Sequence, residues 1–162
     1  MKVALISDTH DNLIRIRQAL RIFSARGCEV LIHAGDIGAP FALKETLKFP
    51  GKVYAVFGNN DGERKGLKQV LPGISRGPLK LKLDGVRIVT VHEREALTEQ
   101  DVADADVLVF GHNHRAEVKP GVPLSVNPGE CGGWLTGRAT VAMLDTGTRS
   151  AEIIELGASQ CK

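Results

Sequence analysis

The sequence has little of what marks a secreted, membrane-bound or polyanion-binding protein. Its three cysteines, Cys28, Cys131 and Cys161, are odd in number and widely spaced, so they predict reduced thiols rather than a disulfide framework or a thiolate metal site. The charge is nearly balanced, with 21 basic against 19 acidic residues and a formal net charge of +2. Bulk charge therefore gives no support for nucleic acid as a partner or for attraction to a membrane surface.

Long apolar runs are also missing. The first residues, MKVALISDTH, hold only a short apolar run before Asp8, so we expect no signal peptide. No stretch approaches the length of a membrane span, and we expect a cytoplasmic protein. With 162 residues, of which 43% are hydrophobic and 25% charged, the composition predicts one globular domain over residues 1–162.

Several familiar catalytic motifs are absent. Gly51-Lys52 lacks the upstream glycine of a phosphate-binding loop, and no Rossmann glycine pattern follows the first apolar run. His92-Glu93 begins like a zinc-protease helix, but Ala96 stands where the second histidine is required. No Gly-x-Ser-x-Gly elbow is present, which argues against a serine hydrolase of that type.

Short apolar, β-branched runs predict buried strands, and periodic segments between them predict helices. The main strands are expected over residues 3–6, 30–32, 53–57, 86–91 and 107–110, and further strands over 79–83, 124–126, 140–144 and 151–156. Strand 79–83 should form a hairpin with 86–91 through Asp84-Gly85. Helices are expected over 12–26, 40–48, 63–71 and 96–103. This order predicts layered sheets with helices outside.

Each of the five main strands ends in a short polar cluster. These are Ser7-Asp8-Thr9-His10, Gly35-Asp36, Gly58-Asn59-Asn60-Asp61, His92-Glu93 and Gly111-His112-Asn113-His114. In sheets built from crossover units, loops at the carboxyl ends of the strands share one edge, where ligands bind. Taken singly, each cluster is better explained by ordinary turn chemistry than by a metal site. Four of the five histidines lie in these clusters, however, which favours one shared site.

The donor types predict a metal site. Carboxylate, imidazole and amide groups without sulfur suit manganese, iron, nickel, cobalt or zinc. Asp8 with His10, and His112 with His114, are spaced by two, so in extended backbone each pair points the same way and can bind one metal. Seven ligands exceed what one ion uses, so we predict two metals bridged by Asp36. The fifth histidine, His33, is expected to be a buried structural imidazole or to line the edge of the site.

Together, and in this order, the clusters resemble the motifs of the calcineurin-like metallophosphoesterases over positions 3 to about 130. The chain length and the Asn127-Pro128-Gly129 turn resemble the small single-domain phosphodiesterases of bacteria and archaea. The resemblance implies an α/β fold, a four-layer αββα sandwich of two facing mixed sheets flanked by helices. It assigns one metal to Asp8, His10, Asp36 and His114, and the other to Asp36, Asn59, His92 and His112.

The sequence departs from the family pattern in three places. Asn60 stands where many members carry a histidine that protonates the leaving group, and asparagine is no general acid. Either Asp61 or Glu93 substitutes, or the substrate has a good leaving group. Glu93 replaces a glycine, and it either adds negative charge at the mouth of the site or points outward. Glu130 replaces a serine ahead of a glycine-rich stretch with Trp134, where substrate selectivity can change.

We therefore predict a dinuclear-metal phosphodiesterase that cleaves small phosphoesters by in-line attack of a metal-bridging hydroxide. The catalytic residues would be Asp36 as the bridge, Asn60 as a hydrogen-bond donor to the phosphate, and His112 close to the phosphate. Manganese is the metal we expect, with nickel, iron, cobalt and zinc as alternatives. Diesters are favoured over monoesters by the resemblance alone.

Three alternatives stay open. One is a non-catalytic protein-binding scaffold, because the same fold resembles a retromer subunit that has lost part of its metal site. The seven ligands kept in this sequence argue against that class. The second is metal-dependent regulation without catalysis, which would show tight metal binding but no turnover. The third is a nuclease, for which the nearly balanced charge gives no support. Members of the small phosphodiesterase branch often self-associate, so a homodimer is expected.

Overall fold

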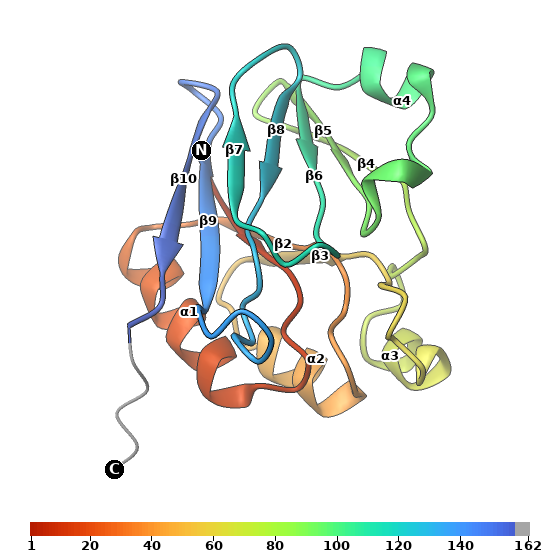
Figure 1. Ribbon diagram of the computed structural model, residues 1–162, viewed down its shortest axis with the longest axis vertical. Coiled ribbons are helices and arrows are strands. Elements are labelled where there is room, and N and C mark those ends of the chain that lie inside the picture. Colours follow the sequence, from red (N-terminus) through yellow and green to blue (C-terminus); the bar gives the residue numbers. More distant parts are fainter. Residues whose placement is uncertain (158–162) are drawn as a thin grey trace.

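The computed structural model describes residues 1–157, whose strands form two five-stranded mixed sheets (Figure 1). The first sheet has the order β10-β9-β1-β2-β3. Its parallel strands are β1 (Lys2–Ile6), β2 (Val30–His33) and β3 (Lys52–Ala55), and its antiparallel strands are β9 (Thr140–Asp145) and β10 (Ser150–Glu155). The second sheet has the order β4-β5-β6-β8-β7. Its parallel strands are β5 (Val86–Thr90), β6 (Val107–Val109) and β8 (Leu124–Asn127), and its antiparallel strands are β4 (Leu79–Leu83) and β7 (Glu117–Lys119).

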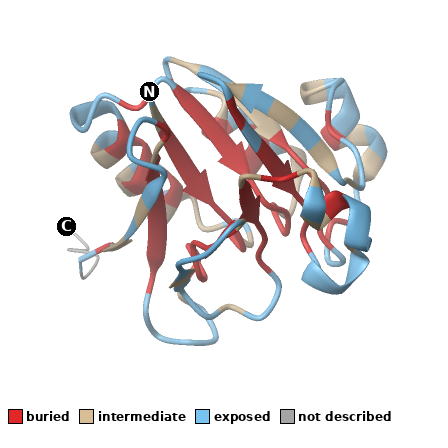
Figure 2. Cartoon of the chain, turned by 90° about the horizontal axis from the view of Figure 1, so that it is seen from above, coloured by how far each residue is buried: buried red, intermediate tan, exposed pale blue. Residues whose placement is uncertain are grey.

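Residue alternation within β1 explains how the first sheet is covered on both faces. Val3 and Leu5 pack in the apolar layer between the two sheets, where Val107 and Val109 of β6 meet them. Residues at even positions of β1, such as Ile6, pack on the opposite face against helices. The central strands are accordingly buried on both sides, as Figure 2 shows.

Helices cover the outer face of each sheet. On the first sheet they are α1 (Leu13–Ala25), α2 (Pro40–Thr46) and α3 (Arg64–Val70), which insert Phe23, Leu43 and Leu67 into one apolar cluster with β1. On the second sheet, Val102 of α4 (Glu99–Ala103) packs against Leu108 of β6. The predicted αββα sandwich is thus confirmed. None of the helices in residues 1–157 is long and apolar enough to cross a membrane.

The fourth predicted helix was wrong in its first half. Residues Arg94–Ala96 form a short 3-10 turn, η1, and α4 begins only at Glu99. Thr98 has extended backbone, with φ −80° and ψ 162°, and forms a capping box with Asp101, so the helix starts after it. The edge strand β7 was not predicted, because Glu117–Lys119 has a single apolar residue and pairs with β8 alone.

A short ion-pair network joins α1 to α2. Glu45 is buried, and its carboxylate accepts from Arg17 Nε at 2.8 Å and from Lys48 Nζ at 2.8 Å. These hydrogen bonds lower the pKa of Glu45 from 4.5 to about 2. Two of the cysteines, Cys28 and Cys131, are buried free thiols, as predicted, and Cys161 lies outside the described residues.

Candidate metal centre

The five polar clusters meet at one edge of the sandwich. Main-chain hydrogen bonds join the strand ends within the first sheet, from Asp8 N to Gly35 O at 3.0 Å, and within the second, from Gly111 N to His92 O at 3.0 Å. A third, from Cys131 N to Ser7 O at 3.0 Å, joins the segment after β8 to the end of β1. The arrangement follows from the parallel strands, whose carboxyl ends point the same way.

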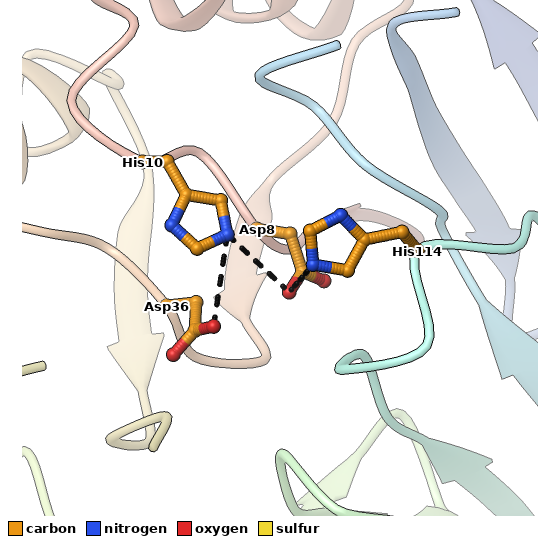
Figure 3. Close-up of side chains that lie close together, drawn as sticks. All are labelled: Asp8, His10, Asp36 and His114. Carbon is orange, nitrogen blue, oxygen red and sulfur yellow. Dashed lines mark ion pairs between the residues drawn. The ribbon is translucent and has the colours of Figure 1, made fainter. Parts of the chain in front are cut away.

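One group of ligand atoms is closely packed. Asp8, His10, Asp36 and His114 each offer one atom, and these atoms all lie within 4.8 Å of one another (Figure 3). His10 Nε2 is 3.6 Å from Asp36 Oδ2 and 3.9 Å from Asp8 Oδ1. His114 Nε2 is 3.4 Å from the same oxygen of Asp8. Both carboxylates are almost completely buried, so salt screens them little.

The backbone at these ligands is not extended, and the reasoning that paired them in extended backbone was wrong. All four residues of the two predicted pairs have positive φ, and so does Asp36: 53° at Asp8, 41° at His10, 56° at Asp36, 71° at His112 and 60° at His114. Aspartate and histidine tolerate this left-handed region better than most residues do. The chain turns sharply over the edge of the sheet at each position, and the side chains converge because of these turns.

A second group shares Asp36 with the first. His92 Nε2 lies 3.4 Å from Asp36 Oδ2 and 2.9 Å from Asn59 Oδ1, and His112 Nδ1 lies 3.0 Å from the same Asn59 oxygen. His92 Nδ1 is 2.8 Å from the carbonyl oxygen of Ala34, to which it can donate its proton. That bond turns the lone pair of Nε2 toward Asp36 and Asn59, as a metal ligand requires.

Two glycines permit this close approach. A Cβ at Gly58 would overlap the carboxylate of Asp36, and a Cβ at Gly111 would overlap the hydroxyl of Ser7. The second contact lies between the two sheets, since Gly111 follows β6 and Ser7 follows β1. The Gly-Asn and Gly-His pairs of the motifs are therefore steric requirements of the site.

The electrostatics of the two carboxylates differ. Burial raises the pKa of Asp8, against the hydrogen bond from Ser7 and the nearby His92 and His114. Burial would also raise the pKa of Asp36, but the neighbouring His92 ring and the two hydrogen bonds from Asn60 outweigh it and hold that pKa well below its usual range. Asp36 is therefore a carboxylate throughout the physiological pH range.

These residues fit a divalent metal ion. Among the described side chains, the buried atoms without a hydrogen-bond partner include Asp8 Oδ1, His10 Nε2 and His114 Nδ1. Buried polar atoms that lack a partner are costly and uncommon. Asp8 Oδ1 and His10 Nε2 belong to the close-packed group, and coordination would satisfy both. A nitrogen and oxygen donor set of this kind suits a first-row transition metal.

The residues after Asn59 have clear positions. The main-chain N–H of Asn60 donates to Asp36 Oδ1 at 2.9 Å, and its side-chain amide donates to Oδ2 at 2.7 Å. Asp61 is buried, and its carboxylate accepts from the N–H groups of Ile37 at 2.8 Å, Gly38 at 2.9 Å and Gly58 at 2.7 Å. Asp61 therefore joins two strand ends and does not face the metal ligands.

His33 is the buried structural imidazole that the sequence predicted. Its Nδ1 accepts from the N–H of Gly35 at 3.2 Å, so its Nε2 carries the proton and donates to Thr9 Oγ1 at 3.0 Å. Burial lowers the pKa of His33 to about 3, which keeps the ring neutral. Glu93, in contrast, is exposed.

Asn127 supports the site, and the sequence reasoning gave it no role beyond a family turn. Its side-chain amide donates to Gly111 O at 3.0 Å and to Asn113 Oδ1 at 2.9 Å, which holds the loop that carries His112 and His114. The sequence did contain an indication of this role, because Asn127 stands at the end of an apolar strand, where the predicted ligands also stand.

Comparison with known proteins gives consistent results. The pattern of the calcineurin-like phosphoesterase superfamily domain matches residues 1–149. A phosphodiesterase of Methanocaldococcus jannaschii is 36% identical over 155 residues, which cover 90% of this chain and 93% of that protein. A solved archaeal phosphodiesterase superposes with a TM-score of 0.86 at 34% identity, covering 96% of this chain and 100% of the other. A solved phosphoesterase from E. coli shares the fold, with a TM-score of 0.67 at 24% identity over 97% of this chain and 100% of the other.

Proposed function

Because this chain belongs to the calcineurin-like phosphoesterase superfamily, we propose that it hydrolyses small phosphodiesters at a centre of two divalent metal ions. The observation that carries the proposal is the position of Asp36. Its Oδ2 lies 3.6 Å from His10 Nε2 and 3.4 Å from His92 Nε2, so one carboxylate faces the ligands of both groups. The first ion would be held by Asp8, His10, Asp36 and His114, and the second by Asp36, Asn59, His92 and His112.

When bound, such a pair lowers the pKa of a water molecule and offsets charge on the phosphoryl group during in-line attack. The protein's own part is to orient the ester. Asn60 uses one N–H of its side-chain amide on Asp36 and is exposed, so its second N–H is free to donate to a phosphoryl oxygen. His112 is also exposed, beside Asn59, and is placed to contact the same phosphoryl group.

Neither Asn60 nor Asp61 is suited to protonate the leaving group, and Glu93 is exposed to solvent. Asn60 is not an acid, and the carboxylate of Asp61 is occupied by three main-chain N–H groups. We therefore infer a preference for esters whose leaving group departs readily as an anion, such as aryl phosphodiesters.

Two hollows, one on either side of the loop that carries His112 and His114, could hold the two substituents of a diester. A hollow of about 540 Å³ beside His114 is lined by Arg115 and Ile153, among others. A smaller hollow of about 210 Å³ beside His112 is lined by Arg94 and Phe110, among others. Both hollows also contain acidic residues, Glu155 in the first and Glu95 and Glu117 in the second, so their charge is mixed. Their apolar side chains can take up the organic substituents of a diester.

Manganese is the metal that we propose, since the donors are nitrogen and oxygen, with nickel, iron, cobalt and zinc as alternatives. A cytoplasmic location, on the basis of the sequence, and a homodimer, on the basis of the family resemblance, complete the proposal. Light scattering that returns the monomer mass of 17.4 kDa would remove the dimer from it.

The test is hydrolysis of bis-p-nitrophenyl phosphate and p-nitrophenyl phosphate, before and after chelation and after addition of Mn²⁺. We expect chelator-sensitive turnover that is faster on the diester. His112→Ala and Asp36→Asn should each lower kcat at least a hundredfold, whereas Asp104→Asn, at a partly exposed position on the far side of the second sheet, should retain it. Tight metal binding without turnover of either ester would favour metal-dependent regulation without catalysis, and the absence of both metal binding and turnover would favour the scaffold alternative.

A further inference from the structure

Glu130 is a fully buried carboxylate beside the candidate metal centre. The turn that follows it supplies its hydrogen-bond donors. Oε1 accepts from the main-chain N–H groups of Trp134 at 2.8 Å and Leu135 at 2.9 Å. Oε2 accepts from the N–H of Thr136 at 2.9 Å and from its hydroxyl at 2.8 Å. The carboxylate is therefore fixed in place by the residue 134–136 turn.

His114 lies between this carboxylate and that of Asp8. Its Nε2 is 3.4 Å from Asp8 Oδ1, and its Nδ1 is 3.4 Å from Glu130 Oε1. Within residues 1–157, no other histidine has its two ring nitrogens near two different carboxylates. The Nδ1 atom is buried and has no hydrogen-bond partner among the described residues, and Glu130 is the acceptor next to it.

We propose that Glu130 is a positioning residue that accepts the Nδ1–H of His114 and thereby presents the Nε2 lone pair to the first metal ion. A small rotation of the imidazole converts the 3.4 Å contact into a hydrogen bond. Histidine ligands generally donate their second ring N–H to an acceptor, which fixes both the tautomer and the ring orientation. The inference rests on the metal centre of the proposed function and is independent of which ester is cleaved.

The same turn also reaches the other histidine of the first ion. The indole Nε1 of Trp134 donates to the carbonyl oxygen of His10 at 3.1 Å. Glu130 therefore fixes a turn that contacts the backbone of His10, while its carboxylate faces the ring of His114. Of the second ion's two histidines, His92 uses the carbonyl of Ala34 instead, and neither contacts Glu130, so the effect of Glu130 should be confined to the first ion.

The experiment measures metal affinity by competition with a chromogenic chelator, using Mn²⁺ and Zn²⁺, and does not depend on turnover. Glu130→Gln, His114→Ala and the double variant form a double-mutant cycle. We expect Glu130→Gln to weaken one of the two binding events about tenfold to a hundredfold, because a neutral amide oxygen accepts the His114 proton more weakly than a carboxylate does. In the His114→Ala background the same substitution should lose most of its effect, because the contact with that ring is absent and only the contact of the turn with His10 remains.

The control is Thr136→Val, which removes a hydroxyl donor from Oε2 and leaves the contact between Oε1 and His114 in place. It should keep the wild-type affinity. An equal loss in Thr136→Val, an unchanged affinity in folded Glu130→Gln, or a full effect of Glu130→Gln in the His114→Ala background would each overturn the proposal.

A second measurement covers the case in which Glu130→Gln does not fold. In the wild-type protein with Zn²⁺ bound, nitrogen-15 NMR should show a His114 Nδ1 proton that exchanges slowly with water and is missing in His114→Ala. A rapidly exchanging Nδ1 proton would contradict the hydrogen bond to Glu130. If these results appear but no ester is cleaved, the proposed reaction fails while the role of Glu130 stands.

Discussion

Replacing Asp61 by asparagine separates a structural carboxylate from a catalytic one. The carboxylate accepts three main-chain N–H groups, those of Ile37, Gly38 and Gly58, and it is almost completely buried. An asparagine oxygen in the place of Oδ1 can still accept the first two, but its NH₂ group then faces the N–H of Gly58. One unpaired buried donor costs about 1–3 kcal/mol, so the free energy of unfolding should fall by about that amount.

The assay combines urea denaturation, in the presence of chelator, with turnover at saturating Mn²⁺ well below the melting temperature. Because Asp61 does not face the metal ligands, any loss of kcat in Asp61→Asn should be the same factor for an aryl diester and for an alkyl diester. A general acid would instead contribute about 10²–10⁴-fold, and mainly for the alkyl ester, whose leaving group needs the proton. Unchanged stability with a selective loss on the alkyl ester would refute the structural role.

Three further changes have defined outcomes. Asn60→His should raise kcat for an alkyl diester relative to an aryl diester at least tenfold, since it restores a proton donor; an unchanged ratio would contradict this. Gly58→Ala places a methyl group against Asp36 and should weaken Mn²⁺ binding, whereas Gly73→Ala, with open space around it, should bind as the wild type does in the same titration. The Glu45 ion pairs should stabilise the fold above pH 4.5 and lose this effect as the pH falls from 4.5 toward about 2, because the folded pKa is depressed. The free energy of unfolding of Glu45→Gln, measured by denaturation at a series of acidic pH values, should therefore fall less than that of the wild type between pH 4.5 and about 2.

Much of the fold could be predicted because its strands are short apolar runs with clear ends. The helices 13–25, 40–46 and 64–70 lie within the predicted ranges for the same reason, since each has an apolar face and a defined start. The failures fell where this signal is weak. β7 has one apolar residue in three, and the start of α4 is decided by the cap at Thr98 rather than by the apolar residues before it.

The ligand set could be proposed from residue types at strand ends, but its geometry could not. Positive φ at Asp8 and His114 depends on how the chain turns over the sheet edge, and no local pattern records it. The contact of Glu130 with His114 joins residues 16 positions apart through the ends of two strands, β6 and β8. The sequence alone shows that Glu130 departs from the family pattern. That it faces the ring of His114 can be seen only in the folded structure.

The two sheets supply different candidate ligands to the proposed centre, which would tie activity to the lifetime of the protein. Asp8, His10, Asp36 and Asn59 follow strands of the first sheet, and His92, His112 and His114 follow strands of the second. Ions held between them would bind only the folded chain, so each tenfold rise in free metal above Kd would add about 1.4 kcal/mol per site to the free energy of unfolding. Without metal, the sandwich would open more often at this edge and be cut more readily by proteases. Metal supply would then set the amount of the protein as well as its rate.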